Sequence, residues 1–221
     1  MPVNVVVLGP PGAGKGTQTA RLAVKKGLVR VATGDILREA VKRKTALGLA
    51  AGRLIDQGQL VDNETMIGIV KERISRPDVE AGFLLDGFPR TVAQAIALDG
   101  LIVEAKLGPL VVLNINVPVD ELVRRLLERK VCKACGNNAT PGDTLSVCRA
   151  CGGGLVRRSD DIDSVVRNRL EVFGQQTKPL VEFYQSRSAY FQVDGAQDAE
   201  LVTTALEAAL ELAIERRGQL A

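Results

Sequence analysis

The chain contains a glycine-rich loop whose residue types suit the binding of phosphate groups. The loop reads Gly9-Pro10-Pro11-Gly12-Ala13-Gly14-Lys15-Gly16-Thr17, between an apolar run at 3–8 and an expected helix at 17–26. Glycines let backbone N–H groups converge on phosphate oxygens, and the N-terminus of the helix adds partial positive charge. Lys15 would supply a full charge to the outer phosphates of a nucleotide, and the Thr17 hydroxyl could reach Mg²⁺. We therefore expect a nucleoside triphosphate site, with a glycine-rich turn that binds nothing as the weaker alternative.

An acidic residue follows a second apolar run. Asp86 comes directly after residues 82–85, whose composition predicts a buried strand. A carboxylate at a strand end beside a phosphate loop can hold the hydration shell of Mg²⁺. The same carboxylate could instead cap a helix. Next to this loop we favour the first role, and we expect Thr17 and Asp86 to form a magnesium site.

Four cysteines form two close pairs. Cys132 and Cys135 make one Cys-x-x-Cys pair, Cys148 and Cys151 make the other, and a glycine follows each pair. Paired knuckles of this kind place four thiolates tetrahedrally around Zn²⁺, although Fe²⁺ or Co²⁺ could occupy the same four-sulfur site. Two disulfides are the alternative, which a cytoplasmic location disfavours. Four thiolates leave no position for a substrate, so we expect a structural metal.

Bulk composition excludes several classes of function. Of the 221 residues, 46% are hydrophobic and 25% are charged, as in soluble globular proteins. The absence of histidine removes Ser-His-Asp triads and histidine-bound metals. A net charge of +3 gives no general reason to expect binding to nucleic acid or to a membrane. No apolar run is long enough to span a bilayer, and the N-terminus lacks the basic residues of a signal peptide, so we expect a cytoplasmic location.

Strands alternate with helices along most of the chain. Apolar runs predict strands at 3–8, 82–85, 110–117 and 190–193, and charged amphipathic runs predict helices at 17–26, 119–130 and 200–217. This alternation favours an α/β fold with a parallel sheet. Two segments interrupt it: residues 32–61, helical in pattern with Gly48, Gly52 and Gly58 as breaks, and residues 129–161, rich in glycine and cysteine. We expect both to be insertions on a core made of residues 1–31, 62–128 and 162–221.

Three further motifs, taken with the loop, resemble the adenylate kinases along nearly the whole chain. They are Thr33-Gly34-Asp35-Ile36-Leu37-Arg38, Gly58-Gln59-Leu60-Val61 and Asp86-Gly87-Phe88-Pro89-Arg90-Thr91-Val92-Ala93-Gln94. The resemblance implies a phosphate-loop core of parallel β-sheet flanked by helices, an AMP-binding insertion at 32–61 and a metal-binding lid at 129–161. It also implies the reaction MgATP + AMP ⇌ 2 ADP.

The resemblance assigns roles residue by residue. The residues implied in ATP binding are Gly12, Ala13, Gly14, Lys15, Gly16, Thr17, Arg125, Arg129 and Gln197. Those implied in AMP binding are Thr33, Arg38, Gln59, Leu60, Val61, Gly87, Phe88, Pro89, Arg90, Gln94, Arg158 and Arg169. The implied catalytic cations are Lys15, Arg90, Arg125, Arg129, Arg158 and Arg169. Asp160 and Asp161 match hinge carboxylates that order these arginines.

The chain departs from the family pattern in two places. The proline usual after Val61 is replaced by Asp62, which could alter the hinge of the AMP-binding insertion. An aromatic residue, often with a histidine, usually follows the first cysteine pair, where this chain has Asn137-Asn138-Ala139-Thr140. Contact between ATP and Asn138 or Ala139 is therefore left open.

Two alternatives to an AMP kinase follow from the same residues. Another monophosphate kinase would use UMP or CMP as acceptor or GTP as donor, but such pyrimidine kinases are expected to have Asn in place of Gln94. A nucleotide-dependent zinc-ribbon protein would need a basic, aromatic-bearing ribbon to bind nucleic acid. Residues 130–154 carry three basic residues and no aromatic. We therefore expect the partners to be ATP, AMP and ADP, and the protein to be a monomer.

Overall fold

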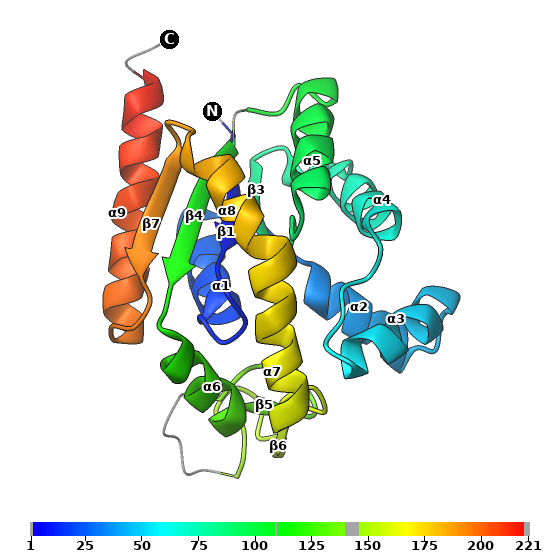
Figure 1. Ribbon diagram of the computed structural model, residues 1–221. Coiled ribbons are helices and arrows are strands. Elements are labelled where there is room, and N and C mark those ends of the chain that lie inside the picture. The colour runs from blue at the N-terminus through cyan, green and yellow to red at the C-terminus, as the bar shows by residue number, and fades with distance from the viewer. Residues whose placement is uncertain (1, 109, 140–145, 219–221) are drawn as a thin grey trace.

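Five parallel strands form the central sheet, and helices cover both of its faces (Figure 1). The structure, a computed structural model, describes residues 2–108, 110–139 and 146–218. The strands are β1 (Val3–Leu8), β2 (Val29–Ala32), β3 (Gly82–Asp86), β4 (Leu110–Asn116) and β7 (Tyr190–Asp194). Their order is β2-β3-β1-β4-β7, and every neighbouring pair is parallel. The predicted α/β fold with a parallel sheet is confirmed; β2 was not predicted.

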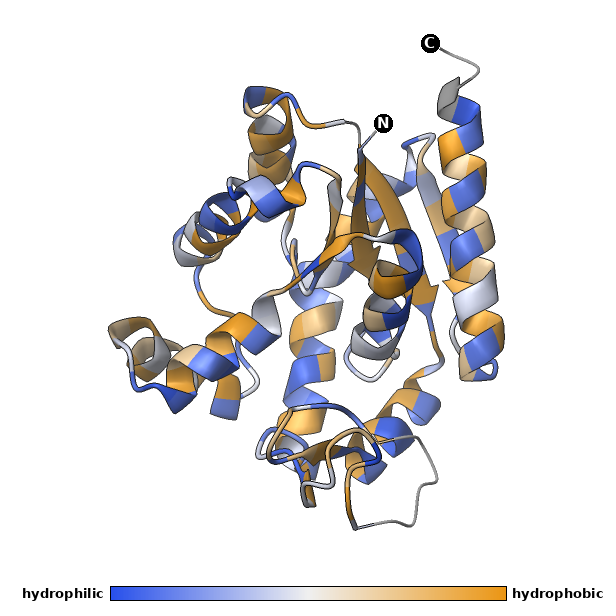
Figure 2. Ribbon diagram, turned by 180° about the vertical axis from the view of Figure 1, so that it is seen from behind, coloured by the Kyte–Doolittle hydropathy of each residue, from blue (hydrophilic) through white to orange (hydrophobic). Residues whose placement is uncertain are grey.

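The sheet is apolar on both faces because helices bury each one. Figure 2 shows the strands as a hydrophobic layer between helices with mixed surfaces. Val5 and Val7 of β1 pack in one apolar cluster, and Val6 and Leu8 pack in the other. Helices α1 (Lys15–Lys26), α6 (Val119–Glu128) and α9 (Ala199–Gly218) contribute to the first cluster. Helices α4 (Asn63–Ile74), α5 (Val92–Glu104) and α8 (Lys178–Gln185) contribute to the second.

Residues 32–61, the helical segment, form two packed helices, α2 (Thr33–Lys42) and α3 (Ala46–Asp56). The prediction that Gly48 and Gly52 break the helical pattern is wrong, because both lie inside α3. The chain instead reverses near Lys44, which has a φ of 52°. A Cβ atom at Gly48 would lie 2.0 Å from the carbonyl oxygen of Ala40, so this glycine allows α2 and α3 to approach closely.

Residues 129–161, the cysteine segment, contain the short antiparallel strands β5 (Lys130–Cys132) and β6 (Leu155–Arg157). In Figure 1 this segment lies beside α6 and α7 (Asp163–Val172), away from the sheet. The predicted helix 119–130 is too long: α6 ends at Glu128, and Arg129 is extended with a φ of −63° and a ψ of 128°. Arg125 and Arg129 therefore do not share a helical face, because the chain turns into β5 between them.

Helix α7 contacts both of these segments. The Asn168 side chain donates a hydrogen bond to the carbonyl oxygen of Gln57, just after α3. A Cβ atom at Gly58 would lie 2.8 Å from Cγ of Arg169, so α7 packs directly against the end of the helical segment. A π-helical turn, Phe173–Thr177, then joins α7 to α8, which buries Leu180 and Tyr184 in the core. Among the described residues, no helix is both long enough and apolar enough to cross a membrane.

Candidate active site

The phosphate loop joins β1 to α1 in a conformation that requires glycine. Gly12 and Gly14 have φ values of 86° and 89°, which L-residues with side chains rarely adopt. A Cβ atom at Gly12 would also lie 3.0 Å from the carbonyl oxygen of Leu122, because α6 packs against the loop. The loop thus holds α6, with Arg125 near its end, next to the start of α1.

Lys15 lies in a strongly positive environment. Its ammonium group donates hydrogen bonds to the carbonyl oxygens of Gly9 at 2.7 Å and Pro10 at 2.9 Å. Burial lowers the pKa of Lys15 to about 7, and Asp86 only partly opposes this effect. The pKa is lowered further by the charges of three arginines from separate elements: Arg90, Arg129 and Arg169. An anionic ligand among these cations would relieve their mutual repulsion.

Asp86 lies beside the loop at the end of β3, where it is the parallel partner of Val7. Its Oδ2 atom accepts hydrogen bonds from the Thr19 hydroxyl at 2.9 Å and from Arg30 at 2.6 Å. A Cβ atom at Gly16 would lie 3.7 Å from the same oxygen. The carboxylate therefore faces the start of α1, whose first turn contains Thr17. Sequence reasoning did not identify Arg30.

A pocket opens beside the loop, between the helical segment and α7. Its lining residues are Thr33, Gly34, Leu37, Arg38, Ile55, Gly58, Gln59, Leu60, Val61, Met66, Arg90, Gln94, Asp160 and Arg169. Most residues predicted for AMP binding line it. Gly87, Phe88, Pro89 and Arg158 do not. Phe88 is fully buried in the core, and the Gly87 carbonyl accepts a hydrogen bond from Nε of Arg90 at 2.9 Å, so this turn orients Arg90.

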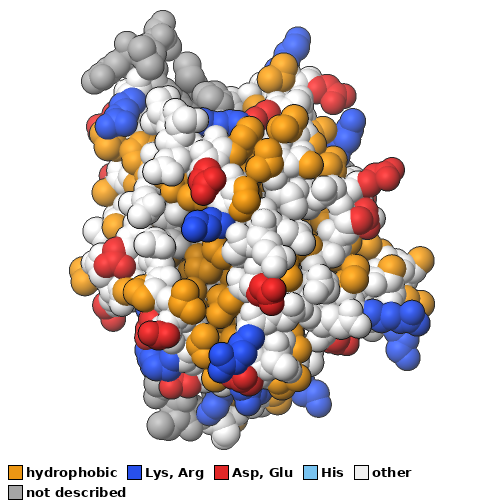
Figure 3. All heavy atoms as spheres, viewed as in Figure 1, with side chains coloured by type: hydrophobic (Ala, Val, Ile, Leu, Met, Phe, Trp, Pro, Cys, Tyr) orange, Lys and Arg blue, Asp and Glu red, His pale blue; other side chains and the backbone are white. Residues whose placement is uncertain are grey.

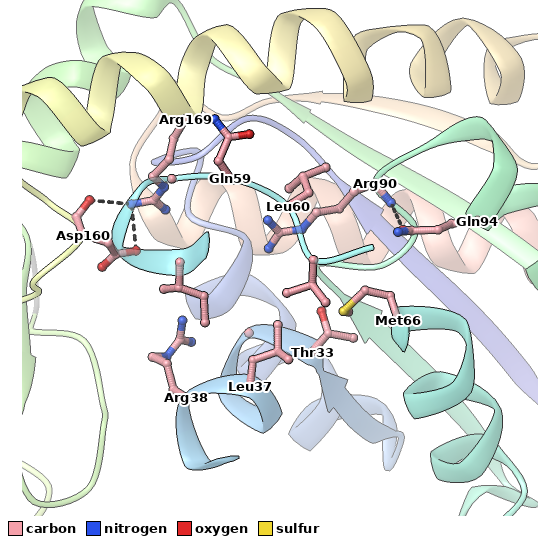
Figure 4. Close-up of a pocket in the computed structure, with 14 residues that line it drawn as sticks. Thr33, Leu37, Arg38, Gln59, Leu60, Met66, Arg90, Gln94, Asp160 and Arg169 are labelled. Carbon is pink, nitrogen blue, oxygen red and sulfur yellow. Dashed lines mark hydrogen bonds and ion pairs between the residues drawn. The ribbon is translucent and has the colours of Figure 1, made fainter. Parts of the chain in front are cut away.

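The pocket has one cationic end and one amide-bearing end. Figure 4 shows Arg38, Arg90 and Arg169 entering one side of it from α2, the β3–α5 loop and α7. Gln94 and Met66 lie toward the other side (Figure 4). Arginine suits bidentate phosphate binding, whereas an amide beside an apolar side chain suits the edge and face of a base. The pocket can therefore hold a nucleoside monophosphate with its phosphate toward the loop.

Gln94 has a fixed amide orientation. Its Oε1 accepts a hydrogen bond from the backbone N–H of Arg90 at 2.7 Å, and its Nε2 donates to Oδ1 of Asn63 at 3.0 Å. A backbone N–H can only donate, so the oxygen of Gln94 must face Arg90. The Thr91 hydroxyl donates to the same Asn63 oxygen at 3.0 Å. One Oε1 lone pair and one Nε2 hydrogen are left for a ligand. Asn63 was not predicted.

Two buried aspartates organise the arginines between the pocket and the cysteine segment. Asp161 accepts a bidentate pair from Arg129 at 2.7 and 2.6 Å. Arg169 contacts both Asp161 and Asp160 at 3.0 Å. Arg158 lies nearby, since burial and the charges of Arg129 and Arg38 lower its pKa to about 10. Apart from Arg125, the arginines predicted to contact phosphate lie close enough to interact electrostatically. They are Arg38, Arg90, Arg129, Arg158 and Arg169.

Arg125 lies at a separate position and connects two elements. It donates to Glu121 at 2.7 Å and to the carbonyl oxygen of Gly195 at 2.9 Å. Hydrogen bonds from Arg124 and Arg125 hold the pKa of Glu121 at about 2. Gln197 is exposed two residues after Gly195, where its amide approaches the Asp194 carbonyl at 3.4 Å. Arg125 therefore stabilises the turn that carries Gln197.

The four cysteines lie close enough to hold one ion. Their sulfur atoms are all within 4.8 Å of one another, with Cys132 and Cys151 at 3.4 Å and Cys135 and Cys148 at 3.7 Å. A tetrahedral site with Zn–S bonds of about 2.3 Å has sulfur separations of roughly 3.8 Å. A backbone N–H donated to its sulfur lowers the pKa of Cys132 to about 6, which favours the thiolate that a metal binds.

The two cysteine knuckles have matching backbone geometry. The N–H of Gly136 donates to the Cys132 carbonyl at 2.9 Å, and the N–H of Gly152 donates to the Cys148 carbonyl at 2.8 Å. The two glycines have φ values of 74° and 72°. A Cβ atom at Gly153 would lie 2.9 Å from the Cys132 sulfur. A side chain at position 153 would therefore crowd the Cys132 sulfur, and the four-sulfur donor set fits a tetrahedral metal.

Several pocket residues had no distinguishing signal in the sequence. Leu37, Ile55 and Met66 line the pocket, but an apolar residue on a pocket wall has the same periodicity as one in the core. Asn138 was left open as an ATP contact; its Oδ1 accepts a hydrogen bond from Arg158 at 3.3 Å, and its amide nitrogen would lie 3.8 Å from a Cβ atom at Gly16. Thr140 lies outside the described residues.

Comparison with known proteins gives a consistent match. The family model described as adenylate kinase matches residues 7–189. An adenylate kinase of Archaeoglobus fulgidus is 46% identical over 213 residues, covering 95% of this chain and 98% of that protein. One from Methanothrix thermoacetophila is 47% identical over 198 residues, covering 88% and 92%, and one from Desulfitobacterium hafniense is 43% identical over 213 residues, covering 95% and 98%. The chain belongs to the adenylate kinase family.

Proposed function

We propose that this phosphotransferase moves the terminal phosphoryl group of MgATP to AMP, giving two ADP. The observation that carries the proposal is the position of the arginines. They lie between the phosphate loop and a pocket whose far end carries an oriented amide. Phosphoryl transfer needs little covalent work from a protein and depends on positioning and charge. A chain without histidine can therefore perform it.

The cations have separate tasks in this proposal. Lys15 and the loop N–H groups bind the β- and γ-phosphates of ATP, with Arg125, Arg129 and Gln197 on the same side. Arg38 and Arg90 bind the acceptor phosphate. Arg158 and Arg169 neutralise charge on the phosphoryl group as it moves. The surroundings of Lys15 support this assignment: burial is the main cause of its lowered pKa, and the charges of Arg90, Arg169 and Arg129 lower that pKa further, as expected where phosphate would bind.

Mg²⁺ is assigned to Thr17 and Asp86. The Asp86 carboxylate lies at the start of α1, and its hydrogen bonds from Thr19 and Arg30 keep it oriented. These residues fit a hydrated Mg²⁺ ion, which prefers one or two protein oxygen ligands together with phosphate and water. The ion would neutralise charge that develops on the phosphate oxygens; the chain's own residues bind and orient both nucleotides.

The cysteine segment is assigned a structural metal, with Zn²⁺ favoured and Fe²⁺ or Co²⁺ as alternatives. Four sulfur atoms within 4.8 Å support a closed site that has no position for substrate. In this reading residues 129–161 are a lid, residues 32–61 are the AMP-binding insertion, and the remaining residues form the core. Action as a monomer in the cytoplasm, on ATP, AMP and ADP alone, stays a prediction.

The orientation of Gln94 sharpens the choice of acceptor. With Oε1 held by Arg90 and Nε2 held by Asn63, the amide cannot rotate to exchange its donor and acceptor. Adenine presents an adjacent donor and acceptor, whereas uracil and guanine present the reverse pair on the corresponding edge. Cytosine shares the adenine pattern on a smaller ring. CMP is therefore the second candidate acceptor, and a comparison of AMP with CMP is the most informative test of acceptor choice.

The test is a coupled assay with AMP, CMP, UMP and GMP as acceptors and with ATP or GTP as donor. We expect AMP with ATP to give the highest kcat/KM. Lys15→Met should reduce kcat by about a thousandfold or more while circular dichroism shows an intact fold. Lys25→Met, in the last turn of the same helix and outside the pocket, is the control and should retain normal turnover. Near-normal kcat in folded Lys15→Met protein would refute the mechanism, and a preference for CMP would refute the acceptor.

A further inference from the structure

One arginine that has no assigned role contacts a residue beside each of the two proposed sites. Arg30, in β2, donates from Nη2 to Oδ2 of Asp86 at 2.6 Å and from Nη1 to Oδ2 of Asp35 at 3.1 Å. Its Nε donates to the Thr19 hydroxyl at 2.9 Å. The planar fork of the guanidinium thus bridges two carboxylates that come from β3 and from α2.

The second carboxylate is already shared. Oδ1 of Asp35 accepts a hydrogen bond from Arg38, whose guanidinium lies over Gly34. Partial burial acts to raise the pKa of Asp35, but hydrogen bonds and charges from Arg38 and Arg30 hold that pKa below its usual value. A continuous line of alternating charge therefore connects the two proposed sites: Asp86, Arg30, Asp35 and Arg38.

The ends of this line face different ligands. Asp86 faces the proposed Mg²⁺ ion, and Arg38 lines the pocket for the acceptor phosphate. Water bound to Mg²⁺ would compete with Arg30 for Oδ2 of Asp86. Arg30 would then interact more strongly with Asp35, and Asp35 would hold Arg38 less tightly. Arg38 would be more available to phosphate, because a carboxylate shared between two arginines attracts each of them less.

We propose that Arg30 is a positioning residue that couples the two sites, so that binding of Mg²⁺ with ATP strengthens binding of AMP. The inference rests on the proposed function, which places Mg²⁺ at Asp86 and the acceptor phosphate at Arg38. Coupling is reciprocal, so AMP strengthens binding of the magnesium nucleotide by the same factor.

The experiment is calorimetric titration of AMP, alone and with Mg²⁺ and a non-transferable ATP analogue, into wild type and Arg30→Gln. The coupling factor is the ratio of the two AMP dissociation constants. We expect a factor on the order of fivefold in wild type and a factor near one in Arg30→Gln. Arg30→Lys keeps the charge but lacks the planar fork, so it should lose most of the coupling as well.

The coupling factor has a matched control variant and outcomes that would contradict the proposed role of Arg30. Arg73→Gln removes an arginine that makes a comparable paired contact with Asp78, outside the pocket, and it should keep the wild-type factor. If Arg30→Gln fails to fold, Asp35→Asn breaks the same bridge from its other end and should show the same loss. An equal factor in wild type and in a folded bridge variant overturns the proposal, as does a factor of one in wild type. Failure of wild type to bind AMP would instead refute the proposed function.

Discussion

Two segments extend from one sheet, and they are stabilised in different ways. The helical segment (residues 32–61) contributes Leu37, Ala51 and Val61 to the main apolar cluster of the protein. The cysteine segment (residues 129–161) has no described residue in either apolar cluster, and its buried residues are Cys132, Cys148 and the two aspartates beside α7. Val147 and Val156 are more than 40% exposed.

These two segments illustrate two ways to stabilise a small segment. One is packing against the core, and the other, proposed for the cysteine segment, is a cross-link within the segment. Apolar packing makes the helical segment a continuation of the main fold, so its stability depends on the sheet. The cysteine segment has no described residue in either apolar cluster, so we expect its stability to depend on a metal held by its four sulfur atoms. The two segments should therefore respond to different perturbations.

Removal of the metal should have the largest effect. Structural zinc contributes roughly 10 kcal/mol of apparent binding free energy in small modules, so chelation or Cys148→Ser should disorder the cysteine segment. Hydrogen exchange should show lost protection across the described parts of residues 129–161 and little change in the sheet. The melting temperature should fall, and residual turnover at moderate temperature should still require Mg²⁺.

Metal analysis, calorimetry and a kinase assay on one stripped sample test this prediction. Re-addition of Zn²⁺ is the control and should restore both order and melting temperature. Complete loss of turnover while the segment stays ordered would mean that the metal takes part in the chemistry.

A single added methyl group should destabilise the helical segment. A Cβ atom at Gly48 would overlap the backbone of Ala40, so Gly48→Ala should lower the free energy of unfolding by about 3 kcal/mol. Gly52→Ala, in the same helix as Gly48, is the matched control: its Cβ would lie 3.6 Å from Val41 of α2, an ordinary van der Waals contact. That variant should be neutral or more stable by up to about 1 kcal/mol. Urea unfolding of the two proteins measures the difference, and similar loss in both would contradict the packing argument.

Loss of the oriented amide should affect one substrate only. Gln94→Ala leaves the N–H of Arg90 and the Oδ1 of Asn63 without this partner and removes the contacts to the base. We expect kcat/KM for AMP to fall about 10- to 100-fold, with KM for ATP nearly unchanged. Asn63→Ala removes the hydrogen-bond partner of Gln94 and Thr91 but leaves the Gln94 amide in place, so it should cause a smaller fall. An equal rise in KM for both nucleotides would contradict the assignment of Gln94 to the base of AMP.

The smallest effect is expected in α6, beside the cysteine segment. Glu121→Gln weakens the hold on Arg125, and KM for ATP should rise less than about fivefold, as is typical of exposed ion pairs. The pKa of Glu121 is depressed from 4.5 to about 2, so the pair is fully formed above pH 4.5 and is lost only as pH falls through 2. The effect of the variant should thus be the same at pH 5 and pH 8. Glu128→Gln, which loses only its pair with Arg124, is the control.

The sequence predicted features whose chemistry is local. The phosphate loop and the cysteine pairs are contiguous motifs, and each required glycine lies within them. Arg30 and Asn63 were missed because their roles depend on partners 56 and 31 residues away. The space limit at Gly48 depends on a carbonyl in another helix. The end of α6 was misplaced because Arg129 and Lys130 are good helix formers, and pairing with β6 outweighs that preference.

The surface gives little indication of these differences. On the face shown in Figure 3, acidic and basic side chains are interspersed among apolar ones. The distinctive charges are turned inward, where the arginines meet Asp160 and Asp161. On that face the surface charges do not mark the proposed site, because the ion pairs that distinguish it lie beneath the surface.

Helix α7 contacts both the helical segment and the cysteine segment. Asn168 donates a hydrogen bond to the Gln57 carbonyl, and Arg169 packs against Gly58 at the end of the helical segment. The guanidinium of the same Arg169 contacts Asp160 and Asp161 at the end of the cysteine segment. The π-helical turn Phe173–Thr177 then joins α7 to α8. Both segments are therefore held by adjacent residues of one helix, so a displacement of α7 would change the contacts of both.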